Sequence, residues 1–224
     1  MLLSDLMKNS VRYFLRLMIS FLARTVYRVR VCGTQNIPLA GPALLVANHV
    51  SFIDGFLIAT CVPTYVRFLV HEQYYDRFAP FLSLVSAIRV PEGARRSLIK
   101  AIELARAELL KGHIVCIFAE GSLTPDGAIH KFQRGFERIV EDLDVPVVPV
   151  HVGGLWGSIF SRHPQRSLPR SIFRMPRRVS ISFGKALLHP SAAQTRDAVC
   201  QLAQQAAEPV RDRTVLSSIE HASF

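Results

Sequence analysis

Cysteine is scarce in this chain, and its few copies are far apart. The four cysteines, Cys32, Cys61, Cys116 and Cys200, stand alone among 224 residues, and no CxxC pair occurs. With no recognisable secretory signal, this spacing predicts neither a disulfide framework nor a zinc site. The eight histidines show no ligand-like spacing with cysteines or carboxylates, so we expect no metal. These features predict a reducing, cytoplasmic location.

Long hydrophobic runs are missing as well, because no stretch reaches the roughly 18 uncharged apolar residues that a spanning helix needs. Half of the residues are nevertheless hydrophobic, and the mean hydropathy is +0.25. This balance predicts a protein that associates with a membrane surface without crossing the bilayer.

Residues 1–28 combine cations with large apolar side chains. Lys8, Arg12, Arg16, Arg24 and Arg28 recur at multiples of four along this segment. The pattern is typical of one or two amphipathic helices, which bind in the membrane interface. The alternative is an ordinary helix that buries its apolar face on the domain.

Acidic residues are absent between Val145 and Arg196, in a chain whose formal net charge is +10. The basic residues of this region are Arg162, Arg166, Arg170, Arg174, Arg177, Arg178, Lys185 and Arg196. Such a block favours an anionic partner, either an anionic membrane surface or a phosphorylated substrate. Nucleic acid is not expected, because no nucleic-acid-binding motif accompanies the charge. A solvated basic face without a specific partner is the alternative.

Short β-like runs alternate with helical stretches from residue 29 onward. Strands are predicted at Val29–Cys32, Ala43–Ala47, Tyr65–Val70, Ile114–Phe118, Val147–Val152 and Val179–Phe183. Helices are predicted at Asp54–Cys61, Ala94–Lys111, Phe132–Leu143 and Ser191–Arg211. The alternation is typical of an α/β fold, so we expect a single layered domain over residues 29–211, with a largely parallel or mixed sheet flanked by helices. Residues 212–224 are expected to form a loosely held tail.

A histidine and an aspartate five residues apart follow the strand predicted at Ala43–Ala47. If Asp54 opens the next helix, its carboxylate can bind one imidazole nitrogen of His49 and leave the other facing the sheet edge. This arrangement is that of a general base, so the leading hypothesis is an enzyme. The alternative is a turn or a helix cap without catalytic function.

A second polar group follows the strand predicted at Ile114–Phe118. Glu120, Gly121 and Ser122 offer a carboxylate, a close backbone approach and a hydroxyl, and ligands bind at the ends of strands in open α/β sheets. We therefore expect them at the same sheet edge as His49, although this tripeptide alone is compatible with a simple turn. Lys131 and Arg134 place two cations just beyond it.

Together these motifs resemble those of the glycerophospholipid acyltransferase family, which includes the bacterial 1-acylglycerol-3-phosphate acyltransferases. The resemblance rests on Asn48-His49 followed by Asp54, on Phe118-x-Glu120-Gly121, and on the run Val145–Pro149, in this order and spacing. It covers roughly residues 29–185. The run Gly154–Arg162 is also similar to the branch found in bacterial 2-acylglycerophosphoethanolamine acyltransferases.

The resemblance implies that His49 takes the proton from a lysophospholipid hydroxyl as its oxygen attacks the thioester of acyl-CoA or acyl-carrier protein, with no other cofactor. Asp54 would orient and stabilise the imidazolium. The family likeness also implies glycerophosphate binding by Glu120 and Gly121, with Ser122 beside them, and we expect Glu120 to bind a hydroxyl or to orient a cation. Ser51 is interpreted as a turn hydroxyl, because the substrate supplies the nucleophile. The expected location is the cytoplasmic face of the membrane.

The chain departs from the family where a phosphate ligand is expected. Leu123 stands in place of an arginine after the Glu-Gly-Ser step, and Glu92 in place of another. Arg89, Arg95 or Arg96 are the candidate replacements, and Arg89 is our choice as a substrate-binding residue. Because these family arginines are missing, two acceptor lipids remain as alternatives: 1-acylglycerol-3-phosphate and a phosphodiester such as lysophosphatidylethanolamine.

Two alternatives from other functional classes follow from the same residues. The fold could serve as a non-catalytic module that binds anionic lipid through the basic region. A nucleic-acid-binding protein, which rests on charge alone, ranks below both.

Overall fold

In the computed structural model, the structure is described for residues 27–77, 87–91, 95–158, 160–162 and 177–207, with residues 95–97 as backbone only. Residues 14, 18, 21, 25, 79 and 82 are described singly. The predicted tail at 212–224 and nearly all of the predicted amphipathic segment at 1–28 lie outside the described residues, so both stay predictions. None of the described helices is long and apolar enough to cross a membrane.

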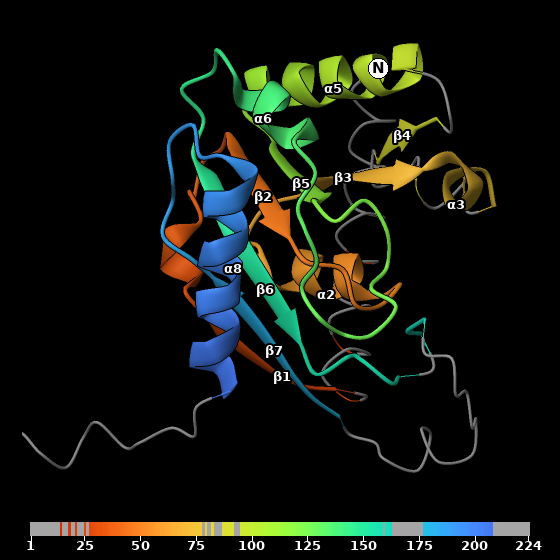
Figure 1. The fold of residues 1–224 in the computed structure, drawn as a ribbon, viewed down its shortest axis with the longest axis vertical. Coiled ribbons are helices and arrows are strands. Elements are labelled where there is room, and N and C mark those ends of the chain that lie inside the picture. The colour runs from red at the N-terminus through yellow and green to blue at the C-terminus, as the bar shows by residue number, and fades with distance from the viewer. Residues whose placement is uncertain are drawn as a thin grey trace, which may run out of the picture.

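The centre of the molecule is a seven-stranded sheet (Figure 1). Its strands are β1 (Tyr27–Cys32), β2 (Ala43–Ala47), β3 (Val66–His71), β4 (Ile88–Val90), β5 (Ile114–Phe118), β6 (Val147–Gly153) and β7 (Arg177–Phe183). Their spatial order is β1-β7-β6-β2-β5-β3-β4, and every neighbouring pair is parallel except β6 and β7. The prediction of an α/β domain with a largely parallel sheet is therefore confirmed.

Six of these strands coincide with predicted ones to within two residues at each end, whereas β4 was not predicted. The helices are α2 (Asp54–Cys61), α3 (Glu72–Arg77), α5 (Arg95–Leu110), α6 (Gly135–Val140) and α8 (Ala192–Ala207), and the 3-10 helix η1 spans Thr34–Asn36. Helix α6 is shorter than the predicted Phe132–Leu143, because the N–H of Gln133 bonds instead to the carbonyl oxygen of Ala119. Helix α3 was not predicted, since six residues carry little periodicity.

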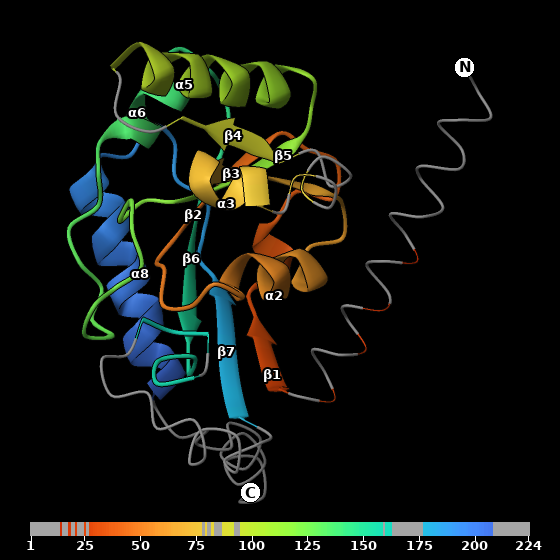
Figure 2. The same ribbon diagram turned by 90° about the vertical axis from the view of Figure 1, so that its right-hand side faces the viewer.

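The sheet separates two hydrophobic cores, and β2 contributes to both because its side chains alternate between faces. Leu44 and Val46 pack with side chains of α5, α6 and α8 in one core. Leu45 and Ala47 pack with Leu57 of α2 in the other. Figure 2 shows the resulting layers, with α8 and α2 on opposite faces of the sheet. All five residues of β2 are buried, as expected for a central strand of a parallel sheet.

The register of the central strands decides which loops meet. Ala47, the last residue of β2, lies opposite Phe118, the last residue of β5, and also opposite Val150 of β6. Because these three strands are parallel, their following segments leave the sheet at one edge. The prediction that the His49 and Glu120 segments share a sheet edge is confirmed.

The segment between β5 and α6, residues 119–134, is here called the β5–α6 loop. Thr124 donates its N–H to the carbonyl oxygen of His49 at 2.9 Å, and its hydroxyl accepts the N–H of Gly127 at 3.1 Å. Gly127 has a φ of +84°, and a Cβ there would lie 2.7 Å from Cγ of Trp156. The only tryptophan of the chain thus packs directly on the loop backbone.

One buried histidine lies inside the sheet. His151 of β6 is 8% exposed and its Nδ1 has no hydrogen-bond partner among the described residues. Burial lowers the pKa of this imidazole to about 4 from its ordinary value of 6.5, because the charged form would lose its hydration.

The contact between Gly127 and Trp156 predicts a difference between two glycine substitutions. Gly127→Ala should destabilise the fold by about 1–2 kcal/mol from the positive φ, and by at least about 1 kcal/mol more because the indole must move. Gly112→Ala is the matched control, since Gly112 has a φ of +82° and no atom within 4 Å of the added Cβ. Urea unfolding followed by far-ultraviolet circular dichroism measures both, and equal losses would show that Trp156 does not restrict this position.

His151 predicts a loss of stability in mild acid. Its folded-state pKa is depressed, so below 6.5 the unfolded chain binds the proton more readily, and stability falls as the pH drops from 6.5 towards 4. From pH 7 to pH 5 this group should cost about 2 kcal/mol. His151→Gln should remove that part of the decline in the free energy of unfolding, whatever it does to stability at pH 7. A decline of unchanged steepness in the variant would argue against the assignment.

Candidate active site

The turn between β2 and α2 is organised by a single carboxylate oxygen. Oδ2 of Asp54 accepts the N–H groups of Val50 at 2.7 Å and Ser51 at 2.8 Å, and it lies 2.9 Å from Nδ1 of His49. Asp54 is completely buried at the first residue of α2. The carboxylate folds back onto the imidazole as the five-residue spacing predicts.

The imidazole of His49 is held with one edge accessible. It stacks on Phe118 with ring centroids 3.9 Å apart and an angle of 14° between the planes. Its side chain is 19% exposed, and no hydrogen bond from the described residues occupies Nε2. Because Nδ1 faces Asp54, the neutral ring carries its proton on Nδ1 and presents the lone pair of Nε2.

The residue before His49 fixes where β2 leaves the sheet. The side-chain amide of Asn48 donates to the carbonyl oxygen of Val152 at 3.0 Å, and its oxygen accepts the N–H of Val152 at 2.8 Å. Asn48 is 1% exposed, so both bonds lie away from water. This side chain extends the β2–β6 pairing by one step beyond the last backbone pair.

Glu120 lies beside His49, but its carboxylate is occupied by main-chain groups. Oε1 accepts the N–H of His49 at 2.9 Å, and Oε2 accepts the N–H of His130 at 3.2 Å. Gly121 follows with a φ of +77°, a conformation that favours glycine, and donates its N–H to Phe118. Ser122 is exposed on the same loop.

Burial shifts both carboxyl groups in the same direction. It raises the pKa of Asp54, and the hydrogen bonds from His49 and from the turn oppose that rise. It also raises the pKa of Glu120, opposed by the backbone N–H groups of His49 and His130. Near neutral pH we expect both groups to be ionised, because N–H donors stabilise the carboxylate form.

Arg89 was expected to bind substrate, but the structure pairs it with acidic side chains of α3. Its guanidinium lies 2.8 Å from Asp76 and 3.2 Å from Glu72. No contact among the described residues joins it to His49 or Glu120. Sequence analysis did not anticipate these partners, because α3 was not recognised as a helix. The side chains of Arg95 and Arg96 are outside the described residues.

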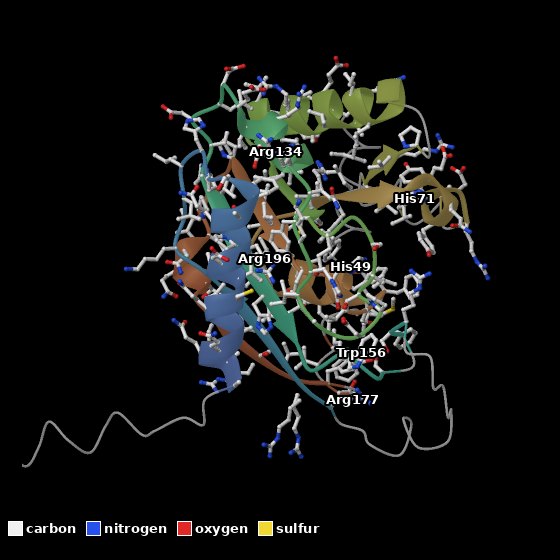
Figure 3. The ribbon with its side chains drawn as sticks, viewed as in Figure 1. His49, His71, Arg134, Trp156, Arg177 and Arg196 are labelled. Carbon is white, nitrogen blue, oxygen red and sulfur yellow. The ribbon has the colours of Figure 1, made fainter. Side chains whose placement is uncertain are left out.

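Lys131 and Arg134 lie along a groove that His49 does not line. Both line a groove of about 770 Å³ between α6 and the start of α8, together with Glu137 and Arg196. Arg134 is bound to Glu137 at 2.9 Å. His49 does not line this groove, and Figure 3 shows Arg134 beside α6, apart from His49. The structure therefore does not bring these two cations to the predicted site.

The basic region is not a continuous free surface in its described part. Arg177 donates to the carbonyl oxygens of Trp156 and Gly157, and Arg196 donates to those of Ile129 and His130. Figure 3 shows Arg177 below Trp156. Arg166, Arg170 and Arg174 lie outside the described residues. These two arginines thus serve the fold by capping loop carbonyl groups.

Among the described residues, no three His, Cys, Asp or Glu side chains gather as a metal site requires. Leu123, where the family pattern has an arginine, is buried at 7% exposure in the β5–α6 loop. The imidazole of His49, bound to the carboxylate of Asp54, is the group of this site that can act as a base.

Sequence reasoning did not assign roles to three residues that shape the site. Asn48 anchors the strand end, Phe118 supports the ring and Thr124 binds the carbonyl oxygen of His49. For Phe118 the signal was available, because a residue at the end of the neighbouring parallel strand must lie beside the residue that follows β2. The other two act through contacts that no local pattern reveals.

Comparison with known proteins points to one family. A model of the Acyltransferase family matches residues 28–153, which is more than half of the chain. The chain is 29% identical over 142 residues to the 1-acyl-sn-glycerol-3-phosphate acyltransferase of Pseudomonas aeruginosa, an alignment covering 61% of this chain and 55% of that protein. It is 27% identical over 187 residues to the enzyme of the same name from Chlamydomonas reinhardtii, covering 80% of this chain and 52% of that one. The chain thus spans about half the length of these curated relatives.

A solved structure supports the same fold. The crystal structure of the 1-acyl-sn-glycerophosphate acyltransferase PlsC from Thermotoga maritima is similar with a TM-score of 0.66, covering 88% of this chain and 80% of that one. At 20% identity this likeness concerns the fold alone. The match of the family model over residues 28–153 shows that the chain belongs to the acyltransferase family.

Proposed function

We propose that this chain transfers a fatty acyl group from an acyl-CoA or acyl-carrier-protein thioester to the free hydroxyl of a lysophospholipid. The observation that carries the proposal is the pair formed by His49 and Asp54. One imidazole nitrogen is bound to a buried carboxylate, and the other is unoccupied by any described residue at a partly exposed edge. This is the arrangement of a base that must deprotonate an alcohol.

The reaction needs no covalent acyl-enzyme. The acceptor hydroxyl oxygen attacks the thioester carbonyl carbon as Nε2 of His49 removes its proton, and Asp54 stabilises the imidazolium. Collapse of the tetrahedral intermediate breaks the carbon–sulfur bond, and the imidazolium returns its proton to the leaving thiolate. A positioned base of this kind contributes roughly 10²–10⁴-fold to the rate.

The acceptor is either 1-acylglycerol-3-phosphate, named for the relatives, or a phosphodiester such as lysophosphatidylethanolamine. A monoester phosphate carries extra negative charge and favours arginine ligands. Leu123 supplies no charge, and Arg89 is already paired with Glu72 and Asp76. These departures favour testing the phosphodiester first.

We place the reaction at the cytoplasmic face of a membrane, where a lysophospholipid acceptor in the bilayer can meet a thioester donor from the aqueous phase. The apolar side chains of Phe14, Met18 and Phe21 are 68%, 50% and 71% exposed, as suits residues that contact lipid. All four cysteines are free thiols, which fits a reducing compartment.

The direct test incubates the purified full chain with lysophospholipids of different headgroups and with either acyl-CoA or acyl-carrier protein. Mass spectrometry should detect a diacyl product for at least one pair of substrates. Absence of product with every pair would contradict the proposal. Salt-sensitive liposome binding without turnover would instead support a non-catalytic lipid-binding module.

Two substitutions should distinguish the contribution of the base, His49, to the rate from that of its charged partner, Asp54. His49→Ala should lower kcat by about 10²–10⁴-fold. Asp54→Asn keeps an oxygen that can accept the bonds of Oδ2, but it places an NH2 group where Oδ1 is buried without a partner among the described residues, so we expect a folded but less stable variant. Its kcat should fall about 10–10³-fold, since the charge that stabilises the imidazolium is removed. Initial rates at saturating substrate test both, with thermal melts to verify folding, and full activity of His49→Ala would end the proposal.

The direct-transfer mechanism predicts that Ser51 is dispensable. Ser51 is completely buried, and its hydroxyl lies 3.5 Å from the N–H of Ile53. Ser51→Ala should retain activity to within about threefold, as expected for loss of one long hydrogen bond. Intact-mass measurement during turnover should find no acylated protein. An acyl adduct that disappears in Ser51→Ala would favour a covalent route instead.

A further inference from the structure

Glu120 has an unusual environment for a residue expected to contact substrate. The residue is 8% exposed, and both carboxylate oxygens accept main-chain N–H groups. One of these groups belongs to His49 and the other to His130. A carboxylate only accepts hydrogen bonds, so two N–H donors from different segments suit it and would not suit an amide.

The main chain of His49 is therefore fixed on both sides by the β5–α6 loop. Its N–H donates to Glu120 at 2.9 Å, and its carbonyl oxygen accepts the N–H of Thr124 at 2.9 Å. Asn48 fixes the preceding residue to β6. With Nδ1 bound to Asp54, the placement of Nε2 follows from these anchors.

We infer that Glu120 is a positioning residue that holds the main chain of His49 and couples it to the β5–α6 loop, and that it does not ligate the acceptor. The inference rests on the proposed function and changes the role of one residue in it. Displacing a reacting group by about 1 Å can cost on the order of 10²-fold in rate. Loss of Glu120 should then weaken catalysis more than substrate binding.

The kinetic test is Glu120→Gln. The amide can accept one of the two N–H groups but turns a donor towards the other. We expect kcat to fall about 10–100-fold, by the same factor for every acceptor headgroup, while the acceptor KM stays within about threefold. An increase in KM with kcat unchanged, or a loss that depends on the headgroup, would overturn the inference and make Glu120 a substrate ligand.

The matched control is Glu108→Gln at the opposite edge of the sheet. Glu108 binds Arg67, Lys111 and His113, at the end of α5 and the starts of β3 and β5. Its pKa is about 2, because these three partners outweigh the effect of burial. This change removes a partly buried carboxylate with several bonds but does not touch His49. It should lower the melting temperature and leave kcat within about threefold; a loss of kcat equal to that of Glu120→Gln would mean that general loosening explains both.

A second measurement needs neither activity nor a variant of Glu120. In protein labelled with ¹⁵N-histidine, the main-chain amide signals of His49 and His130 should titrate together as the Glu120 carboxyl is protonated, at a pH above the ordinary glutamate value of 4.5. Independent behaviour of the two signals would overturn the inference. If the wild-type chain forms no product with any substrate, the proposed function fails, and this titration still decides whether Glu120 binds both segments.

Discussion

The bond between Asp54 and His49 is the interaction on which the site depends. Three donors converge on the same oxygen: the imidazole and two N–H groups of the turn that connects β2 to α2. Burying a carboxylate without hydrogen-bond donors costs free energy. Asp54 therefore stabilises the turn conformation that supplies these donors, and the turn fixes the position of the carboxylate. The turn between β2 and α2 and the orientation of the His49 imidazole therefore form together. The second oxygen, Oδ1, is buried without a partner among the described residues.

The sheet supplies the contacts to His49 from residues that are distant in the sequence. Parallel pairing of β2 with β5 brings Phe118 under the imidazole and Glu120 next to the N–H of His49, across 71 residues of sequence. Pairing of β2 with β6 brings Val152 to Asn48. The two strands that flank β2 thus both help to hold the same histidine. The rigidity of the site comes from the sheet, and its chemistry comes from the loops.

Much of this arrangement could be predicted because it is encoded locally. The five-residue spacing of His49 and Asp54, and apolar runs that end just before the polar motifs, predicted both the pair and the shared edge. Glu120 was correctly placed beside His49, yet the bonds of its carboxylate were not foreseen. A sequence pattern does not reveal which main-chain groups a side chain will bind.

The structure does not bring the cations expected to bind substrate into contact with His49. Arg89 was chosen because it lies near the position of a missing arginine, but the acidic residues of α3 bind it. Lys131 follows the Glu-Gly step by only ten residues, yet the β5–α6 loop carries it to the groove beside α8. A cation can be recognised from the sequence, whereas its counter-ion depends on tertiary contacts between elements too short to predict.

The pairing of β1 with β7 joins segments about 150 residues apart, and β1 has no other neighbour among the described strands. During synthesis, β1 emerges first and stays unpaired until β7 has left the ribosome, whereas β2, β3, β5 and β6 can already associate. Such a non-local strand pair forms late, because closing a long loop costs entropy before any contact repays it. A nascent chain that stops before residue 177 therefore exposes one edge of β6 and the whole of β1, two surfaces prone to aggregation.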